Sequence, residues 1–147
     1  MPNTDSTPQL LVGSYLAERE IPAPGILVSD GSGRSPLNRL APVTLVMLLR
    51  HFWNSDPELR DRFAQTLPVP GTNSTLARRG LGVGTRLRAK TGYIKSCFSL
   101  SGYLSVPTDT LAFSFIVNNC PSGRSAYRLF TRLLLTLLHS PGAATQG

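Results

Sequence analysis

Residues 86–119 read RLRAKTGYIKSCFSLSGYLSVPTDTLAFSFIVNN, and this stretch decides the fold. Apolar and polar residues alternate along it with a period of two, which is typical of half-buried β-strands. The alternation predicts three strands, at Arg86–Ile94, Cys97–Ser105 and Leu111–Asn119. Pro107-Thr108-Asp109 has the composition of a turn between the last two strands. We therefore expect an antiparallel three-stranded meander.

Outside the strands the apolar residues follow a helical period. Four helices are predicted, over residues 9–20, 42–53, 56–67 and 122–139, and prolines end or open most of them. The last helix is expected to turn five apolar residues inward and three arginines toward water: Phe130, Leu133, Leu134, Leu137 and Leu138, against Arg124, Arg128 and Arg132. Ile26–Val28 is expected to be a short, buried extended run. Helices, then an antiparallel meander, then a closing helix make an α+β arrangement with helices packed on a sheet.

The pairing of the last two strands also bears on the two cysteines. A hairpin turn at Thr108-Asp109 predicts that Leu100 lies opposite Val117 and that Cys97 lies opposite Cys120. A shift of two residues would keep the same apolar faces together, so the sequence leaves both registers open. Two cysteines are too few for a disulfide scaffold, and without a Cys-x-x-Cys pair a zinc site is not indicated.

Length and composition indicate one globular domain with a modest core. The chain has 147 residues, of which 41% are hydrophobic and 16% charged. We expect a domain of residues 9–139 between a polar tail, residues 1–8, and a flexible tail, residues 140–147, with no signal peptide and no transmembrane segment. The formal charge of +7 comes from scattered arginines without interleaved aromatic residues, which argues against a nucleic-acid partner.

Several short motifs, taken in order, carry a family resemblance. They are Asp30-Gly31-Ser32-Gly33 with Ser35 and Asn38 behind it, Ala41-Pro42, the turn Gly71–Leu76, Arg88-Ala89-Lys90-Thr91-Gly92, and Ser99-Leu100-Ser101-Gly102-Tyr103. Together they resemble the class C low-molecular-mass penicillin-binding proteins, the D-alanyl-D-alanine carboxypeptidase/endopeptidase family. The resemblance runs from about residue 9 to residue 138. It implies the C-terminal part of a penicillin-binding/serine β-lactamase-like transpeptidase fold, with an incomplete sheet.

The resemblance also implies a substrate-binding strand. In that family Lys90-Thr91-Gly92 would bind the terminal carboxylate of the substrate, and the Tyr93 amide would contribute to the oxyanion hole. Weaker substrate-binding candidates lie in the polar loop: Asp30, Ser32, Arg34 and Ser35. Asp, Gly and Ser also form turns for backbone reasons, so a structural role for Asp30 and Ser32 is the simpler interpretation. The sequence departs from the family pattern at Tyr93, where a small hydroxyl residue is usual, and at Pro36, where arginine is usual.

The two other motifs of the family, Ser-x-x-Lys and Ser-x-Asn, are absent from this sequence. The positions three before the two lysines, Lys90 and Lys95, hold Leu87 and Gly92, and none of the six asparagines has a serine two positions before it. No residue is therefore assigned as nucleophile or activating lysine. The resemblance implies a periplasmic protein of the cell wall that meets peptidoglycan stem peptides or β-lactams, a missing N-terminal portion as a partner, and no metal or cofactor.

Three functional hypotheses follow. The first is a fragment or truncated homologue of a serine-type D-Ala-D-Ala carboxypeptidase, a hydrolase, that is inactive alone. The second is a non-catalytic module that binds peptidoglycan or a partner chain. The third is a small basic nucleic-acid-binding protein. Acylation by a labelled penicillin would support an enzyme, and salt-sensitive retention of DNA or RNA would support the last.

Overall fold

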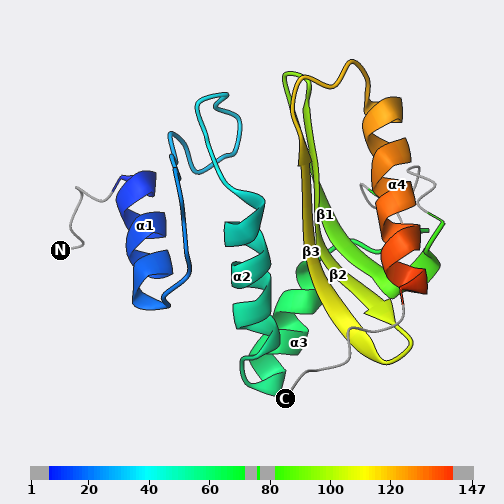
Figure 1. Cartoon of the computed structure of the whole chain (residues 1–147). Helices are drawn as coiled ribbons and strands as arrows, with labels where there is room; N and C mark the ends of the chain where they lie inside the picture. Colours follow the sequence, from blue (N-terminus) through cyan, green and yellow to red (C-terminus); the bar gives the residue numbers. More distant parts are fainter. Residues whose placement is uncertain (1–6, 72–75, 77–81, 141–147) are drawn as a thin grey trace.

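The computed structural model describes residues 7–71, 76 and 82–140. Its elements, in chain order, are α1 (Pro8–Glu18), α2 (Pro42–Trp53), α3 (Pro57–Thr66), the 3₁₀ turn η1 (Gly84–Arg86), β1 (Leu87–Ile94), β2 (Cys97–Val106), β3 (Asp109–Val117) and α4 (Gly123–His139). The predicted α+β order of helices, meander and closing helix is confirmed (Figure 1).

The sheet has the order β1-β2-β3 and both pairs are antiparallel. Phe98 lies opposite Val117 and Leu100 opposite Phe115, so the predicted register is wrong by two residues. The cause is the turn: Val106 already pairs with Asp109, so only Pro107 and Thr108 connect the strands. The apolar faces still match, because a shift of two residues preserves the side on which each residue lies.

In the observed register Cys97 and Cys120 are not cross-strand partners. The Cys120 amide instead donates to the Ser96 carbonyl at 2.9 Å, just past the strand ends, and both cysteines are free thiols. The Cys120 thiol lies 3.4 Å from the Ser122 carbonyl and donates to it. Burial raises the pKa of the Cys97 thiol.

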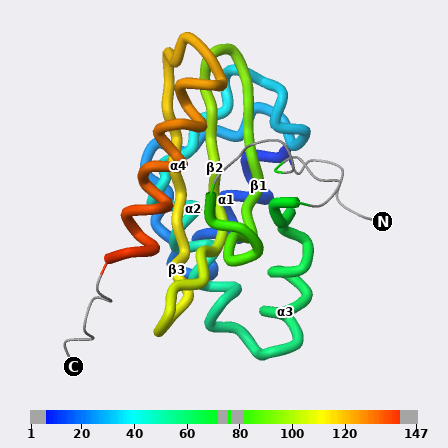
Figure 2. The backbone as a smooth tube through the Cα atoms, turned by 90° about the vertical axis from the view of Figure 1, so that its right-hand side faces the viewer, coloured from blue at the N-terminus to red at the C-terminus, as the bar shows by residue number. Residues whose placement is uncertain are grey.

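Helix α4 covers one face of the sheet, and α2 lies on the other (Figures 1 and 2). Phe130 and Leu134 of α4 are buried in the main core with Leu100 and Leu104 of β2. Ser122 caps the N-terminus of α4, because its hydroxyl accepts the Ser125 amide at 3.2 Å. The expectation that Leu133 points inward is wrong, since it is 37% exposed at the margin of the buried stripe.

Helix α2 packs on β2 and β3 on the opposite face. The Tyr103 hydroxyl donates to the Leu49 carbonyl at 2.7 Å in a buried contact, and burial raises the pKa of Tyr103 to about 12. Helix α3 joins α2 through the stacked rings of Phe63 and Phe52, whose centroids are 4.0 Å apart. On this face the β1 side chains remain exposed.

The N-terminal arm, α1 and the segment after it, lies on the side of α2 that faces away from the sheet (Figure 1). The Thr44 hydroxyl ties the arm to α2 by donating to the Pro22 carbonyl at 2.8 Å. The helix predicted over residues 9–20 is present as α1, and Leu16 is its buried residue. Leu27 forms an isolated bridge with Arg39 and is 41% exposed, so the run around it is extended as predicted but its central residue is not buried.

No described helix is long and apolar enough to cross a membrane.

We predict that Gly102→Ala destabilises the sheet. A Cβ at Gly102 would collide with the Arg88 carbonyl oxygen and would lie 2.6 Å from the Ala89 Cα, and both atoms belong to the paired strand β1. We expect a loss of about 1–3 kcal/mol in the free energy of unfolding, measured by denaturant titration. Gly13→Ala in α1 is the control, because its Cβ would meet nothing within 4 Å. An equal loss in both variants would contradict the prediction.

Candidate functional site

The outer edge of β1 offers unpaired backbone groups. The Ala89 amide donates outward to the Pro68 carbonyl at 3.0 Å, which closes the edge at that point. In an antiparallel strand each residue directs its N–H and C=O to the same side, and the side alternates along the chain. Thr91 and Tyr93 therefore direct their backbone groups to the same outer edge as Ala89. No backbone hydrogen bond within the described ranges pairs them there.

The Lys90 ammonium lies at this edge. It donates to the Thr91 carbonyl at 2.8 Å and is exposed. Pairing sets Lys90 opposite Ser101 on the α2 face, whereas Thr91 is opposite Leu100 on the α4 face. The lysine therefore bends around the strand, occupies the Thr91 carbonyl and places its charge beside the free Thr91 and Tyr93 amides. A cation next to free amides is a suitable arrangement for binding a carboxylate.

Gly92 and Tyr93 shape the same segment. A Cβ at Gly92 would collide with the Ser99 hydroxyl of β2, so only glycine lets the two strands approach with Ser99 in place. The Tyr93 ring is 70% exposed and lies 4.7 Å from the Phe98 ring. Where the family usually has a small hydroxyl residue, this chain therefore has a phenol ring on the α4 face. The Tyr93 backbone amide still lies at the outer edge of β1.

The polar loop around Asp30 is a self-contained turn. The Asp30 carboxylate accepts hydrogen bonds from the Ser32 hydroxyl and the Asn38 side-chain amide, both at 2.7 Å. It also accepts from three backbone amides, at 3.1 to 3.2 Å: Gly33, Arg34 and Ser35. The hydrogen bonds from Ser32 and Asn38 are the main cause that lowers the pKa of Asp30 to about 2.

The turn-forming role expected for Asp30 and Ser32 thus has a clear physical basis. Among the described residues, no hydrogen bond or salt bridge joins Asp30, Ser32, Arg34 or Ser35 to Lys90–Tyr93. The structure therefore brings Lys90, Thr91, Gly92 and Tyr93 together on one strand, and it leaves the loop candidates as a separate unit.

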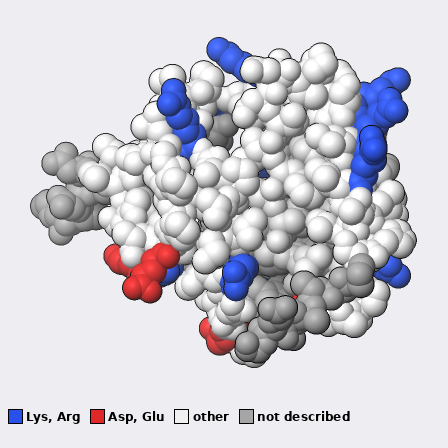
Figure 3. All heavy atoms as spheres, viewed as in Figure 1, with Lys and Arg blue, Asp and Glu red and all other residues white. Residues whose placement is uncertain are grey.

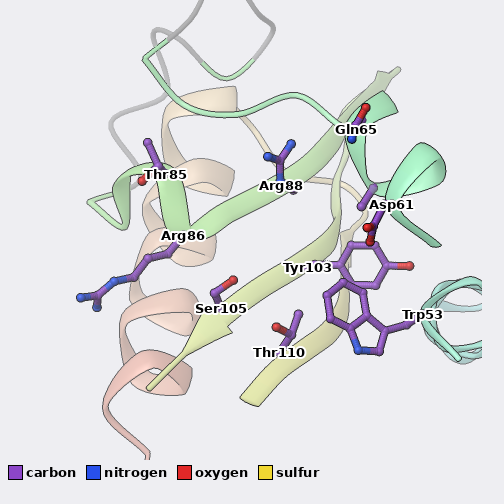
Figure 4. Close-up of a pocket in the computed structure, with 10 residues that line it drawn as sticks. Trp53, Asp61, Gln65, Thr85, Arg86, Arg88, Tyr103, Ser105 and Thr110 are labelled. Carbon is purple, nitrogen blue, oxygen red and sulfur yellow. The ribbon is translucent and has the colours of Figure 1, made fainter. Parts of the chain in front are cut away.

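A cleft beside β1, with a volume of about 230 Å³, was not predicted from the sequence (Figure 4). The residues that line it include Trp53, Asp61, Arg86, Arg88 and Tyr103. The sequence does contain one indication of this cleft. Basic residues at positions 86, 88 and 90 alternate with buried ones, so their side chains lie on one face of the strand. In the part of the chain that the structure describes, no group of three or more His, Cys, Asp or Glu residues could hold a metal ion.

We predict that Ser32→Ala raises the pKa of Asp30 toward its ordinary value of 3.8. Because the folded-state pKa is depressed to about 2, the contribution of the turn to stability is present above pH 3.8 and is lost as the pH falls through about 2. The measurement is an NMR titration of the Asp30 side-chain carboxyl. Ser35→Ala is the control, because Asp30 accepts from the backbone amide of Ser35 and not from its side chain. If the titration midpoint of Asp30 does not move in Ser32→Ala, the Ser32 hydroxyl does not lower the pKa of Asp30.

Known proteins match both the sequence and the fold. A sequence profile of the D-Ala-D-Ala carboxypeptidase 3 (S13) family matches residues 1–132. The chain is 29% identical over 119 residues to the D-alanyl-D-alanine carboxypeptidase DacB of Haemophilus influenzae, covering 78% of this chain and 24% of that protein. It is 37% identical over 106 residues to a D-alanyl-D-alanine carboxypeptidase of Actinomadura, and the match covers 67% of this chain and 19% of that protein.

The crystal structure of penicillin binding protein 4 (dacB) from Haemophilus influenzae superimposes with a TM-score of 0.78 and 25% identity, over 88% of this chain and 31% of that chain. The chain thus spans about a quarter of the length of the curated relatives that it matches. The profile match, the relatives and the fold agree with one another: this chain belongs to the D-Ala-D-Ala carboxypeptidase 3 (S13) family.

Proposed function

We propose that this chain forms the wall of a serine-type carboxypeptidase site that binds the terminal carboxylate of a D-alanine-ended peptidoglycan stem peptide. The free outer edge of β1 at Thr91 and Tyr93, beside the Lys90 ammonium, carries the proposal. An extended peptide can add to a free strand edge through backbone hydrogen bonds. Lys90 would supply the positive charge for the carboxylate at the end of that peptide.

The chemistry would be shared with polypeptide outside this sequence. Acyl transfer needs a nucleophile, a base within hydrogen-bond reach and oxyanion donors around one carbon atom. The Tyr93 amide suits an oxyanion donor, since it faces the free edge. The Ser-x-x-Lys and Ser-x-Asn motifs are absent from these 147 residues, so we propose that the chain is inactive alone. We place the complete enzyme in the periplasm, where its substrate would be.

The absence of a nucleophile favours a second candidate, a non-catalytic module that holds peptidoglycan peptides. It would use the same edge and the same lysine, and it differs only in having no catalytic partner. Nucleic-acid binding has less support. Figure 3 shows lysine and arginine side chains at several separate places on one face, without the continuous basic stripe that a phosphate backbone requires.

We predict that the isolated chain forms no covalent penicillin adduct and releases no D-alanine. Intact-mass spectrometry after incubation with excess benzylpenicillin, and a D-alanine assay with a model stem peptide, test both statements. The physical reason is that no serine here has a lysine three residues later to remove its proton. A stoichiometric adduct that disappears when one serine is changed to alanine would overturn the prediction.

We also predict that N-acetyl-D-Ala-D-Ala shifts the NMR amide signals of Thr91 and Tyr93, and that its C-terminal amide does not. Lys90→Gln should weaken this binding roughly tenfold, because a charge-assisted hydrogen bond is lost. Lys95→Gln is the matched control, since Lys95 is the other lysine and lies in the turn after β1. Binding that survives Lys90→Gln unchanged would contradict the proposed wall.

A further inference from the structure

The cleft beside β1 lies on the same face of the sheet as Lys90 but does not include residues 90–93. Arg88 stands between the sheet and α3, while Trp53 and Tyr103 form a pair of rings at the opposite side (Figure 4). Figure 4 also shows that the Arg86 side chain extends away from the rings, toward the rim. The cleft is therefore built by α2, α3 and the sheet, and Arg88 is its central cation.

Arg88 has no acidic partner in the described part of the chain. The salt bridges there join Arg19 to Glu18, Arg60 to Asp61 and Arg62 to Glu58. Asp61 lines the cleft, but its carboxylate already accepts from the Arg60 Nε at 2.9 Å. A guanidinium presents a rigid set of N–H donors that matches a carboxylate in a bidentate geometry. Arg88 thus offers a charge and a donor set that no residue of the described chain uses.

Trp53 provides the apolar wall of the cleft, and it packs on Tyr103. The centroids of Trp53 and Tyr103 are 4.9 Å apart and their planes are tilted by 45°. Tyr103 is buried and its hydroxyl is bonded to the Leu49 carbonyl, so it supports the Trp53 ring from behind, and the partly exposed Trp53 presents the apolar surface. Ser105 and Thr110, which face each other across β2 and β3, add hydroxyl groups at the end of the cleft. Such a mixture, an apolar wall with a few polar groups, is typical of small-molecule sites.

We infer that this cleft is a second binding site, for a small, singly charged carboxylate that carries a flat or apolar group. Arg88 binds the carboxylate, and the Trp53 ring contacts the flat group. The volume of about 230 Å³ restricts the ligand to a small molecule or to one terminal residue of a larger one. The inference goes beyond the proposed function, since none of its residues belongs to the Lys90 edge.

Trp53 makes the site directly observable, because it is the single tryptophan of the chain. The probe is N-benzoylglycine, which joins a flat ring to one carboxylate, and its control is the neutral amide of the same molecule. We expect a saturable change in tryptophan fluorescence with the acid, weakened by added salt, and no saturable change with the amide. An equal response to acid and amide, or none to the acid, would overturn the inference.

Three variants locate the ligand. Arg88→Gln should weaken binding roughly tenfold or more, since it removes the charged donor but keeps a side chain of similar length. Arg132→Gln, an exposed change on α4 at the other face of the sheet, should leave binding unchanged. Lys90→Gln should change the affinity of the cleft for N-benzoylglycine by less than about twofold. The same variant weakens peptide binding at the outer edge of β1. If Lys90→Gln weakens binding and Arg88→Gln does not, the ligand occupies the edge and the second site does not exist.

Discussion

The close contact between β1 and β2 at Gly102 sets the geometry on which the rest of the structure depends. Any side chain there would strike the backbone of Arg88 and Ala89. This contact holds Arg88 opposite Tyr103 and Lys90 opposite Ser101. A slip by one residue would turn Lys90 toward the buried core and Ala89 toward water, because side chains alternate between the two faces. The β1–β2 register, which requires glycine at position 102, thus determines which face carries the charges.

The two faces of the sheet are covered unequally, and the unequal covering creates the functional surface. Helix α4 closes its face with the main apolar core. Helix α2 packs on β2 and β3, and leaves the side chains of β1 on that face exposed. Arg86, Arg88 and Lys90 follow one another along this open margin. The strand therefore has a free backbone edge and a cationic face at the same time.

The sequence predicted the structure well wherever the spacing of apolar residues indicates which side chains are buried. The three strands, the meander and the closing helix were predicted, because alternation and helical spacing are local patterns. The register was not determined, since two pairings separated by two residues bury the same face and only the length of the turn at Pro107-Thr108 distinguishes them. The helix at α1 was predicted, but leucine spacing cannot tell whether another element packs on it, and only Leu16 is buried there.

The site was predictable only in part. Lys90–Tyr93 form a contiguous motif, whereas the cleft joins Trp53 and Asp61, from two consecutive helices, to Arg88, which comes much later in the chain. No local pattern reports such a meeting. The turn around Asp30 was anticipated because its partners lie within eight residues. Its separation from β1 depends on tertiary contacts that the sequence alone does not reveal.

The order of the elements in space has a consequence for folding kinetics. β1, β2 and β3 follow one another in the chain as they do in the sheet, so the two hairpins that they form are local in sequence. Lys95 and Ser96 both have positive φ, 41° and 62°, as a tight two-residue hairpin turn requires. Closing short loops has a small entropic cost, and low contact order accompanies fast folding. The two hairpins can therefore form quickly, and the core on one face is completed when α4 packs on β2.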